Sequence, residues 1–370
     1  MYFTTTKKYL LNPLKTIIGV IEQRQTLPIL SNTLVGVKEG MLHLTATDSE
    51  VEICCSLPLE SSLDAGSEGE TTIPARKFYD ICRALPDESV IQVNEEDNHA
   101  TIKSGKSRFK LSCLPAEDFP SSPQVESTLT LSLPQKTFKS LLARTSFCAA
   151  VSDVRYYLNG ICLDFIDDKL NVVATDGHRL ALATEDFSLQ GEPTQVIIPR
   201  KAIIELTRML EDVDNEVEIA IDKNHIKVVI SDRLKMSSKL IDGKFPDYQS
   251  VLPLNSDKII TTKCSTLKQA LSQAAILSNE KHKGVRLVFS KNMLRISARN
   301  PEQEESEVEC EIDYSGEEFE IGFNVSYLLE ALAAMTTSEV ELRFSDPNAS
   351  ALIMLKDIKS VKYVVMPMRL

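Results

Sequence analysis

Residues 42–50 read LHLTATDSE, residues 170–178 read LNVVATDGH, and residues 294–302 read LRISARNPE. The three stretches lie about 125 residues apart, and each runs from alternating β-forming residues into turn residues. Solenoid repeats are roughly 20 to 50 residues long and cannot fold alone, whereas a repeat of this length can bury a core of its own. The chain of 370 residues therefore predicts three related domains in tandem.

Two further landmarks keep the same spacing. Residues 73–78 read IPARKF and align with IPRKAI at 198–203 and, more loosely, with FNVSYL at 323–328. The repeats close with Phe119-Pro120, Phe245-Pro246 and Met366-Pro367. From these landmarks we place the domains at residues 1–124, 125–253 and 254–370.

Each repeat shows the same order of patterns: a helix, alternating strands, a second helix and more strands. The segment 8–21 has apolar residues every three or four positions, which is typical of an amphipathic helix. The other expected helices are 75–85, 134–151, 200–210, 265–278 and 325–335. The sequence therefore predicts an α+β fold with antiparallel sheets, two helices per domain, and most of the chain in strands.

Charge is unevenly distributed along the chain. The formal net charge is −12, yet the first four expected helices are basic. Each carries three basic residues and at most one acidic residue when the first is counted with its flanking residues, as 7–22. If the helices share one surface, that surface attracts phosphates without reading bases. The alternative is that each helix has an ordinary solvated face. The helix residues that we assign to a nucleic-acid surface are Arg76, Lys77, Lys139, Arg200 and Lys201.

Composition points away from metals, cofactors and membranes. The hydrophobic share of 43% and charged share of 25% are typical of a globular protein in water. The eight cysteines form no C-x-x-C pair and have no histidine at metal-ligand spacing, so we expect buried thiols in a reducing cytosol. No apolar run approaches the roughly 18 residues of a membrane span, and the N-terminus does not resemble a secretion signal. We expect a cytoplasmic protein without a cofactor or a membrane partner.

Two motifs could suggest catalysis. Gly105-Lys106-Ser107 resembles the end of a phosphate-binding loop, but Ala100 stands where such a loop needs its first glycine. Asp176, His178 and Arg179 bring together acid, imidazole and guanidinium, but an aspartate in the turn at the end of a strand is the better account of Asp176. We expect no catalytic site.

The last seven residues, 364–370, read VVMPMRL and are apolar almost to the end. Either they form a last strand with a loose end, or they form one wall of a groove that binds an apolar peptide. Methionine suits such a groove because its side chain adapts to different partners.

Four segments together identify a family. Residues 24–30, 154–160, 174–180 and 365–370 read RQTLPIL, VRYYLNG, ATDGHRL and VMPMRL, and they resemble the bacterial beta sliding clamp family. Members of this family are the processivity subunit of the replicative DNA polymerase III. The resemblance covers the whole chain.

This resemblance implies a fold, an activity and partners. It implies three tandem clamp domains, and two chains joined head to tail in a six-domain ring whose helices line the hole. It implies a protein that encircles double-stranded DNA, is not an enzyme, and slides. The implied partners are the DNA polymerase III alpha subunit, the delta subunit of the clamp loader, and other DNA polymerases and repair proteins that carry a clamp-binding motif.

The resemblance also implies a peptide-binding groove. Its residues in this sequence would be Leu158, Thr175, Gly177, His178, Arg179, Leu180, Pro246, Val251, Asn324, Tyr327, Val364, Val365, Met366, Pro367, Met368, Arg369 and Leu370. His178 and Arg179 are expected at its rim. Ser250 departs from the family pattern, which often has an arginine at this position, so one flank of the groove differs.

For DNA, the resemblance implies contacts from Arg24 and from Arg155, Tyr156 and Tyr157. For the ring, it implies an interface between the strand that holds Lys106, Phe109 and Leu111 and the third domain of the other chain, with apolar contacts from Ile276 and Leu277.

Two rival interpretations have distinct tests. An enzyme built on Asp176 and His178 would show turnover that disappears in His178→Ala. A scaffold that binds peptides but not DNA would not be retained on circular DNA.

Overall fold

The structure is a computed structural model that describes residues 1–22, 27–59, 66–120, 127–187, 193–253, 256–346 and 349–369. The chain divides into two compact units. Unit 1 comprises Met1–Lys139 and Lys201–Leu240, and unit 2 comprises Ser140–Arg200 and Ile241–Leu370. The boundaries expected after residues 124 and 253, as well as Arg24 and Leu370, fall outside or at the edge of the described residues.

Unit 1 contains two antiparallel sheets. Its strands are β1 (Tyr2–Thr6), β2 (Asn32–Lys38), β3 (Met41–Thr47), β4 (Val51–Pro58), β5 (Gly69–Pro74), β6 (Val90–Glu96), β7 (His99–Ser104), β8 (Ser107–Ser112), β9 (Leu129–Pro134), β14 (Glu216–Ile221), β15 (His225–Ser231) and β16 (Leu234–Lys239). The eight-stranded sheet has the order β5-β2-β3-β4-β16-β15-β14-β9, and the four-stranded sheet has the order β1-β6-β7-β8.

Unit 2 repeats this plan. Its strands are β10 (Gly160–Ile166), β11 (Lys169–Thr175), β12 (Arg179–Asp186), β13 (Thr194–Pro199), β17 (Lys258–Lys263), β18 (Gly284–Ser290), β19 (Met293–Arg299), β20 (Glu305–Glu311), β21 (Phe319–Asn324), β22 (Glu339–Phe344), β23 (Ala351–Leu355) and β24 (Ile358–Val365). The eight-stranded sheet has the order β13-β10-β11-β12-β24-β23-β22-β17, and the four-stranded sheet has the order β20-β19-β18-β21.

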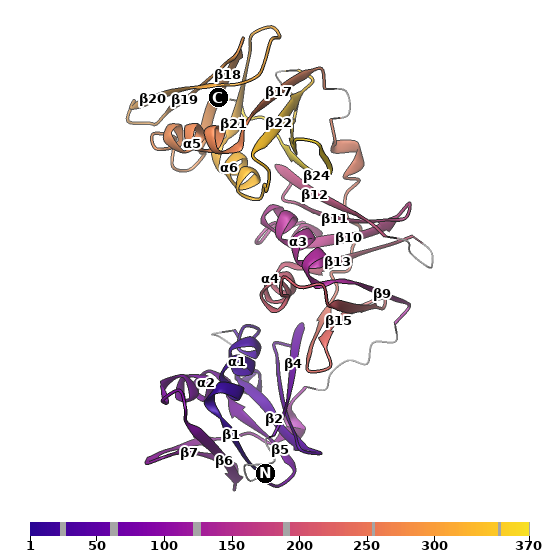
Figure 1. Cartoon of the computed structure of the whole chain (residues 1–370), viewed down its shortest axis with the longest axis vertical. Helices are drawn as coiled ribbons and strands as arrows, with labels where there is room; N and C mark the ends of the chain where they lie inside the picture. The colour runs from indigo at the N-terminus through magenta and orange to yellow at the C-terminus, as the bar shows by residue number, and fades with distance from the viewer. Residues whose placement is uncertain are drawn as a thin grey trace. The chain divides into compact units, whose positions relative to one another are not determined.

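Six α-helices occur in the described residues, two for each sequence repeat. They are α1 (Lys7–Ile17), α2 (Ala75–Ala84), α3 (Gln135–Thr145), α4 (Arg200–Met209), α5 (Cys264–Ala275) and α6 (Val325–Ala333). Short 3-10 turns lie at Pro28–Ser31, Ala116–Asp118, Ser146–Cys148, Tyr156–Leu158 and Gln249–Val251. In unit 1, α1 and α2 lie side by side, as α5 and α6 do in unit 2 (Figure 1). The predicted α+β fold is confirmed.

All six helices end before the expected residue, and two of them, α1 and α3, end four or more residues early. Helix α1 ends at Ile17, and two residues later a Cβ on Gly19 would lie 2.0 Å from the Glu205 carboxylate of α4. Helix α3 ends at Thr145, whose hydroxyl donates to the backbone carbonyl of Leu141 at 2.9 Å and whose backbone leaves the helical region. The apolar periodicity continues past both ends, so periodicity alone placed them too late.

Each eight-stranded sheet crosses a repeat boundary. We call the pair β4–β16 the first joint; its register runs from Leu234 opposite Cys55 to Ser238 opposite Val51. We call the pair β12–β24 the second joint, with Arg179 opposite Val365 and Leu180 opposite Val364. Pairing across the boundary satisfies backbone groups that would otherwise line an open sheet edge. The compact units therefore divide the second repeat between them.

Candidate partner-binding groove and nucleic-acid surface

A tight turn over residues 175–179 connects β11 to β12. The Thr175 hydroxyl donates to the carbonyl of Arg179 at 2.6 Å and accepts from the amide of Gly177 at 3.1 Å. The Asp176 carboxylate accepts from the amides of His178 and Arg179 at 2.9 and 3.0 Å. Asp176 is therefore a turn residue, as its position at the end of a strand suggested.

Arg179 connects this turn to helix α6. Its guanidinium pairs with Asp176 at 3.1 Å and with Glu330 at 2.8 Å, and it donates to the carbonyl of Phe147 at 2.9 Å. It also lies 4.5 Å from the ring centre of Tyr327, a cation–π distance. The side chain is only 10% exposed, so Arg179 is more deeply buried than a rim residue. His178 is exposed, and its ring stacks on Tyr327 with 6.4 Å between centroids.

The C-terminal segment is held against the turn and against β21. After Val364 and Val365 pair in the second joint, the amide of Met366 donates to the carbonyl of His178 at 2.9 Å. The amide of Met368 donates to the carbonyl of Gly322 at 2.8 Å. Asn324, at the end of β21, caps α6 by accepting from the amide of Ser326 at 2.9 Å. Residues 364–369 are therefore ordered, and Met366 remains 40% exposed.

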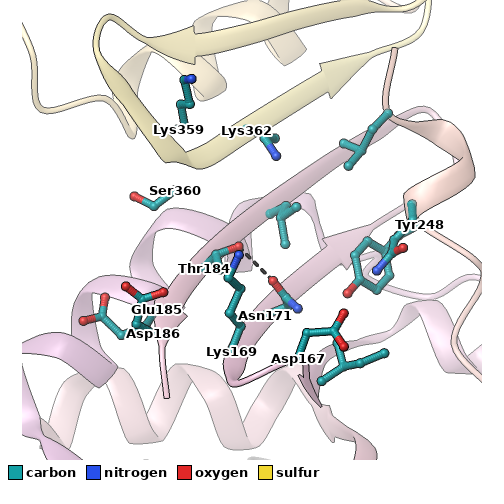
Figure 2. Close-up of a pocket in the computed structure, with 14 residues that line it drawn as sticks. Asp167, Lys169, Asn171, Thr184, Glu185, Asp186, Tyr248, Lys359, Ser360 and Lys362 are labelled. Carbon is teal, nitrogen blue, oxygen red and sulfur yellow. Dashed lines mark hydrogen bonds between the residues drawn. The ribbon is translucent and has the colours of Figure 1, made fainter. Parts of the chain in front are cut away.

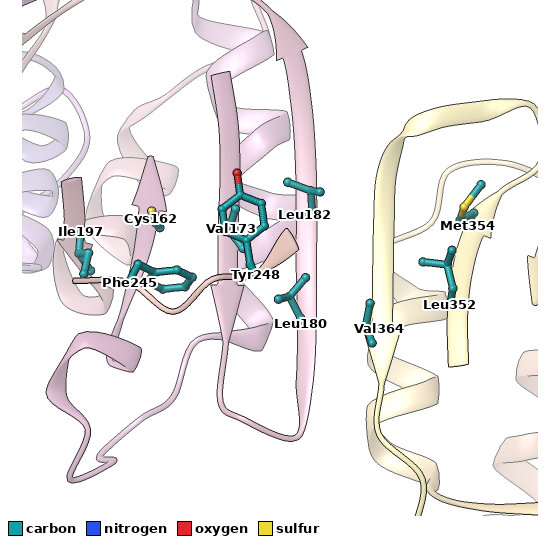
Figure 3. Packing of buried hydrophobic residues seen from close by; sticks show 10 residues of the cluster. All are labelled: Cys162, Val173, Leu180, Leu182, Ile197, Phe245, Tyr248, Leu352, Met354 and Val364. Atoms are coloured by element: carbon teal, nitrogen blue, oxygen red, sulfur yellow. The ribbon is translucent and has the colours of Figure 1, made fainter. Parts of the chain in front are cut away.

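An apolar cluster fills the second joint on one face of the sheet. Figure 3 shows side chains that come from β10–β13, from the segment around Phe245 and Tyr248, and from β23 and β24. Its members are Cys162, Val173, Leu180, Leu182, Ile197, Phe245, Tyr248, Leu352, Met354 and Val364, with Tyr157, Ile241, Val251 and Leu252 packed against them. Of the expected groove residues, the structure thus unites Leu180, Val251 and Val364. Leu158 and Thr175 are buried, and Pro246 is exposed beside Phe245.

Sequence reasoning missed most of this cluster. Val173 and Leu182 are cross-strand partners, as are Leu352 and Val364, so the register unites residues far apart in sequence. Alternation within each strand was the available signal, but it does not show which strands are neighbours. Tyr248 was missed too. It donates to a carboxylate oxygen of Asp164 at 2.6 Å, and burial together with this bond raises the pKa of its hydroxyl.

The residues expected to contact DNA differ in how free their charges are. Lys77 is exposed, Lys139 is half-buried, and Tyr156 is 58% exposed. Arg155 pairs with Asp153 at 2.9 Å, and its hydrogen bonds lower the pKa of that carboxyl to about 2. Tyr157 lies in the same loop, against the apolar cluster.

Three basic residues of the helix starts have partners within the chain. Arg76 donates to the carbonyl of Ile21 at 2.6 Å, and Arg200 donates to the carbonyl of Ala149 at 2.7 Å. Neither carbonyl removes the positive charge. Lys201 is different, because it pairs with Glu22 at 2.8 Å and also with Asp48. Its charge is largely compensated, so it is the least suited of the three to meet a phosphate.

Strands β8 and β20 are each one of the two edge strands of a four-stranded sheet. The first and its preceding turn carry Lys106, Arg108 and Lys110, whereas the second carries Glu305, Glu307, Glu309 and Glu311. Lys106 lies in the two-residue turn between β7 and β8, where Gly105 has a φ of 56°, which explains the false resemblance to a phosphate loop. Phe109, Leu111 and Leu277 are half-buried, and Ile276 is 76% exposed.

The described residues offer little for other kinds of chemistry. Within them, no three His, Cys, Asp or Glu side chains gather closely enough to hold a metal ion. All eight cysteines are free thiols that form no disulfide, and burial raises the pKa of thiols such as Cys55 and Cys82 to about 12. No helix in the described part of the chain has the length and apolar character needed to cross a membrane.

Comparison with known proteins assigns the family. Three models of the DNA polymerase III beta subunit match in chain order: the N-terminal domain at residues 1–123, the central domain at 132–247 and the C-terminal domain at 249–369. The beta sliding clamps of Pseudomonas putida and Escherichia coli K12 are each 47% identical, with all of both chains covered. The crystal structure of the Pseudomonas aeruginosa clamp bound to griselimycin superimposes with a TM-score of 0.95 at 47% identity, again over the whole of both chains. The Caulobacter crescentus clamp gives 0.93 at 34% identity, with the same coverage.

Three clamp domains in series define a processivity factor of DNA replication, and not an enzyme. The chain belongs to the DNA polymerase III beta subunit family, the bacterial beta sliding clamps. Its role in replication is therefore that of a sliding clamp.

Proposed function

We propose that two copies of this chain form a head-to-tail ring around double-stranded DNA and that the ring holds the polymerase III alpha subunit through a groove at the second joint. The observation that carries the proposal is the meeting of the apolar cluster with residues 364–369. Buried Leu180 and Val364 form the floor of the proposed groove, and exposed Met366 and Pro246 give an approaching peptide apolar contacts.

The groove favours a short peptide with a few large apolar anchors. Leucine or phenylalanine side chains gain free energy by leaving water for the cluster, and Met366 can adapt its shape to either. Backbone groups of residues 366–369 and the exposed imidazole of His178 suit a polar side chain such as glutamine. Because a short peptide makes only a small contact with the groove, we expect a dissociation constant in roughly the micromolar range, about −8 kcal/mol.

Removal of residues 366–370 tests the groove. The truncated protein loses one wall but keeps both four-stranded sheets and all six helices. We expect it to lose binding of a fluorescent peptide that carries glutamine and leucine or phenylalanine anchors, while its mass in solution stays unchanged. Met366→Gln should weaken binding, whereas the matched change Met335→Gln, after α6, should not. Unaltered binding by the truncated protein would show that the groove lies elsewhere.

The edge strands β8 and β20 support the head-to-tail dimer. Each has an edge on which backbone groups can pair with another strand, and one edge is basic where the other is acidic. Within the chain, Arg295 and Arg299 of β19 already pair with Glu305, Glu307 and Glu309, so the basic edge would compete with them for these glutamates. In a pairing between two chains each copy offers one edge and receives the other, which closes a ring instead of extending a fibre. Ile276, exposed in the single chain, would be covered there.

Light scattering at micromolar concentration tests the dimer. We expect the mass of two chains for the wild type and of one chain for the double variant Ile276→Glu, Leu277→Glu, because it places charges in an apolar contact. The change Ile204→Glu, at another exposed isoleucine, is the matched control and should leave the dimer intact. A wild-type protein that has the mass of one chain would contradict the ring.

The ring would hold DNA by topology, with weak contacts to phosphates from Arg24, Arg76, Lys77, Lys139, Arg155 and Arg200 and from the exposed ring of Tyr156. Protein loaded on circular DNA should therefore be released when the DNA is cut. Arg24→Ala should weaken contact equally on all sequences and reduce its salt dependence. Release from circular DNA without cutting would favour a peptide-binding scaffold that does not encircle DNA.

The other expected partners would share the same groove. We propose that the delta subunit of the clamp loader and other polymerases and repair proteins with a clamp-binding motif bind there in the cytoplasm. One groove per chain makes these partners competitors. Displacement of a bound alpha-subunit peptide by a delta-subunit peptide is the expected result, and simultaneous binding of both to one chain would contradict it.

A further inference from the structure

The sheet face that carries the apolar cluster of unit 2 continues into a polar cavity of about 670 Å³ (Figure 2). Leu182, Tyr248 and Leu252 belong to or pack against the cluster, and they also line this cavity. The remaining lining residues come from the β10–β11 hairpin, from β11, β12 and β24, and from Gln249. The cavity and the proposed groove are therefore two parts of one surface.

The strand register shows how the surface changes from apolar to polar. Cys162, Val173 and Leu182 lie in one cross-strand row of the cluster, and the next row on the same face is Asp164, Asn171 and Thr184. The Thr184 hydroxyl donates to the side-chain oxygen of Asn171 at 2.8 Å. A peptide that leaves the apolar cluster along these strands thus meets hydrogen-bonding groups after two residues of strand.

Lys362 is a charged residue within a cross-strand row of the cluster itself. Its cross-strand neighbours are Leu182 and Met354, both members of the cluster, and it forms no ion pair with any described residue. Lys169, farther along the face, lies opposite Asp186, which can offset its charge. Lys359, on the same wall as Lys362, adds positive charge (Figure 2).

The first joint contains an equivalent lysine in a different setting. Lys235 lies opposite Cys54, as Lys362 lies opposite Leu182, and Glu52 is on the same face two residues from Cys54. In the second joint the position equivalent to Glu52 is occupied by Leu180. The sheet itself thus places a carboxylate near Lys235 but places none at the equivalent position near Lys362.

We propose that this cavity receives the part of a bound partner peptide that flanks its apolar anchors, and that an acidic side chain in that part pairs with Lys362. The inference rests on the groove proposed above. A peptide that covers Lys362 removes its ammonium group from water, and a covered charge without a partner is costly. A carboxylate compensates it, so the second joint selects partners with an acidic residue beside the anchors.

The test uses the anchor peptide described above in five forms. One is unextended, two carry a pair of acidic residues at the N- or the C-terminal end, and two carry the corresponding amides. Affinities are measured by fluorescence anisotropy at low and at high salt for the wild type, for Lys362→Met and Lys362→Glu, and for Lys291→Met as the control. Lys291 is an exposed lysine of unit 2 without an ion pair among the described residues.

We expect one acidic peptide to bind the wild type and Lys291→Met about fivefold more tightly than its amide counterpart, with a smaller ratio at high salt. Lys362→Met should bind both equally, and Lys362→Glu should bind the amide form more tightly than the acidic form. Equal binding of acid and amide at both ends by the wild type would overturn the inference, as would a preference that persists in Lys362→Met. If even the unextended peptide fails to bind the wild type, the groove itself is wrong and the inference falls with it.

Discussion

At the first joint the turn aspartate Asp48 accepts from the amides of Glu50 and Val51 at 2.9 and 2.7 Å, and at the second joint Asp176 accepts from His178 and Arg179 in the same way. The cation that pairs with the aspartate comes from the following repeat at the first joint and from the same repeat at the second. At the first joint it is Lys201 of helix α4, and at the second it is Arg179 of strand β12. The same backbone arrangement is therefore stabilised by two different ion clusters.

The sheet faces of the two joints differ more strongly. The pair Glu52 and Ser237 at the first joint corresponds to Leu180 and Val364 at the second. One joint is thus polar where the other is apolar, although their strands pair in the same register. The joint is therefore a structural feature common to both units, and a few cross-strand pairs decide whether its face is polar or apolar.

The largest expected effect comes from giving the second joint the residue of the first. Leu180→Glu places a carboxylate where the side chain is 3% exposed and lies among apolar neighbours, so we expect a loss of about 3 kcal/mol or more in the free energy of unfolding of unit 2, and no measurable peptide binding. Urea denaturation and anisotropy measure the two effects. Glu52→Leu is the matched change at the first joint and should alter stability by about 1 kcal/mol or less, with peptide binding intact. Equal losses in the two variants would mean that the joints do not differ as their faces suggest.

Removing the cation of each joint should give the next largest effect. Arg179→Met removes the guanidinium from Asp176, from the carbonyl of Phe147 and from the ring of Tyr327, so we expect a loss of about 3 kcal/mol and weaker peptide binding. Lys201→Met should cost only about 1 kcal/mol, since the Lys201 side chain is 31% exposed, against 10% for Arg179. Hydrogen exchange of β11–β12 and of β3–β4 would locate each loss. A larger loss of stability in Lys201→Met than in Arg179→Met would contradict this ranking of the two cations.

The turn residues give a smaller contrast. Gly177 and Ser49 occupy equivalent positions with φ values of 86° and 76°, and a Cβ at Gly177 would lie 2.8 Å from the Arg155 guanidinium. We expect Gly177→Ser to cost about 1 to 2 kcal/mol, through backbone strain and displacement of Arg155. Ser49→Gly should change stability by less than about 1 kcal/mol, because relief of strain is offset by greater freedom of the unfolded chain. Thermal unfolding of the two variants measures both changes in stability. An unchanged unfolding temperature in Gly177→Ser would show that the turn tolerates a side chain.

The smallest effect concerns two equivalent glutamates. Glu330 pairs with Arg179 of another element, whereas Glu205 lies beside Gly19 and pairs with Arg208 of its own helix at 2.7 Å. Burial raises the pKa of the Glu205 carboxyl, although the charge of Arg208 opposes that rise. The folded state therefore holds this proton at a higher pH than the unfolded state, so stability falls as pH rises through the interval between the two pKa values. Glu205→Gln should remove this fall and be slightly more stable than the wild type at neutral pH, while Glu330→Gln should be less stable. Urea midpoints between pH 4 and 7 measure both, and an unchanged pH dependence in Glu205→Gln would contradict the burial argument.

The sequence repeat and the spacing of apolar residues were sufficient to predict the fold class. Apolar residues at helical spacing, such as Leu10, Leu14 and Ile17, do form the buried face of a helix. They were not sufficient for the joints. Strand patterns do not identify β16 as the neighbour of β4, or β24 as the neighbour of β12, because pairing between distant segments depends on the assembled sheet. This is why three repeats in sequence become two compact units in space.

The candidate site was predictable in part. Residues 174–180 and 364–370 stood out because a turn motif and an apolar terminus are local features. Tyr248 and Met354 did not stand out, since a single tyrosine or methionine in a strand-rich chain has no local mark of its role. Lys362 gave no signal either, and only the register places it beside the apolar cluster.

The sheets that cross the repeat boundaries also affect how this protein can be taken apart. A fragment cut at the end of the first repeat would expose the edge of β4, and one cut at the end of the second would expose the edge of β12, each a bare template for association with other chains. The sequence repeat is thus not an exchangeable module, because replacing it would require new partners for strands in both of its neighbours. A substitution on β16 or β24 changes the contacts of the strand that it pairs with in the preceding repeat. The sequences of neighbouring repeats are therefore constrained to change together along these strands.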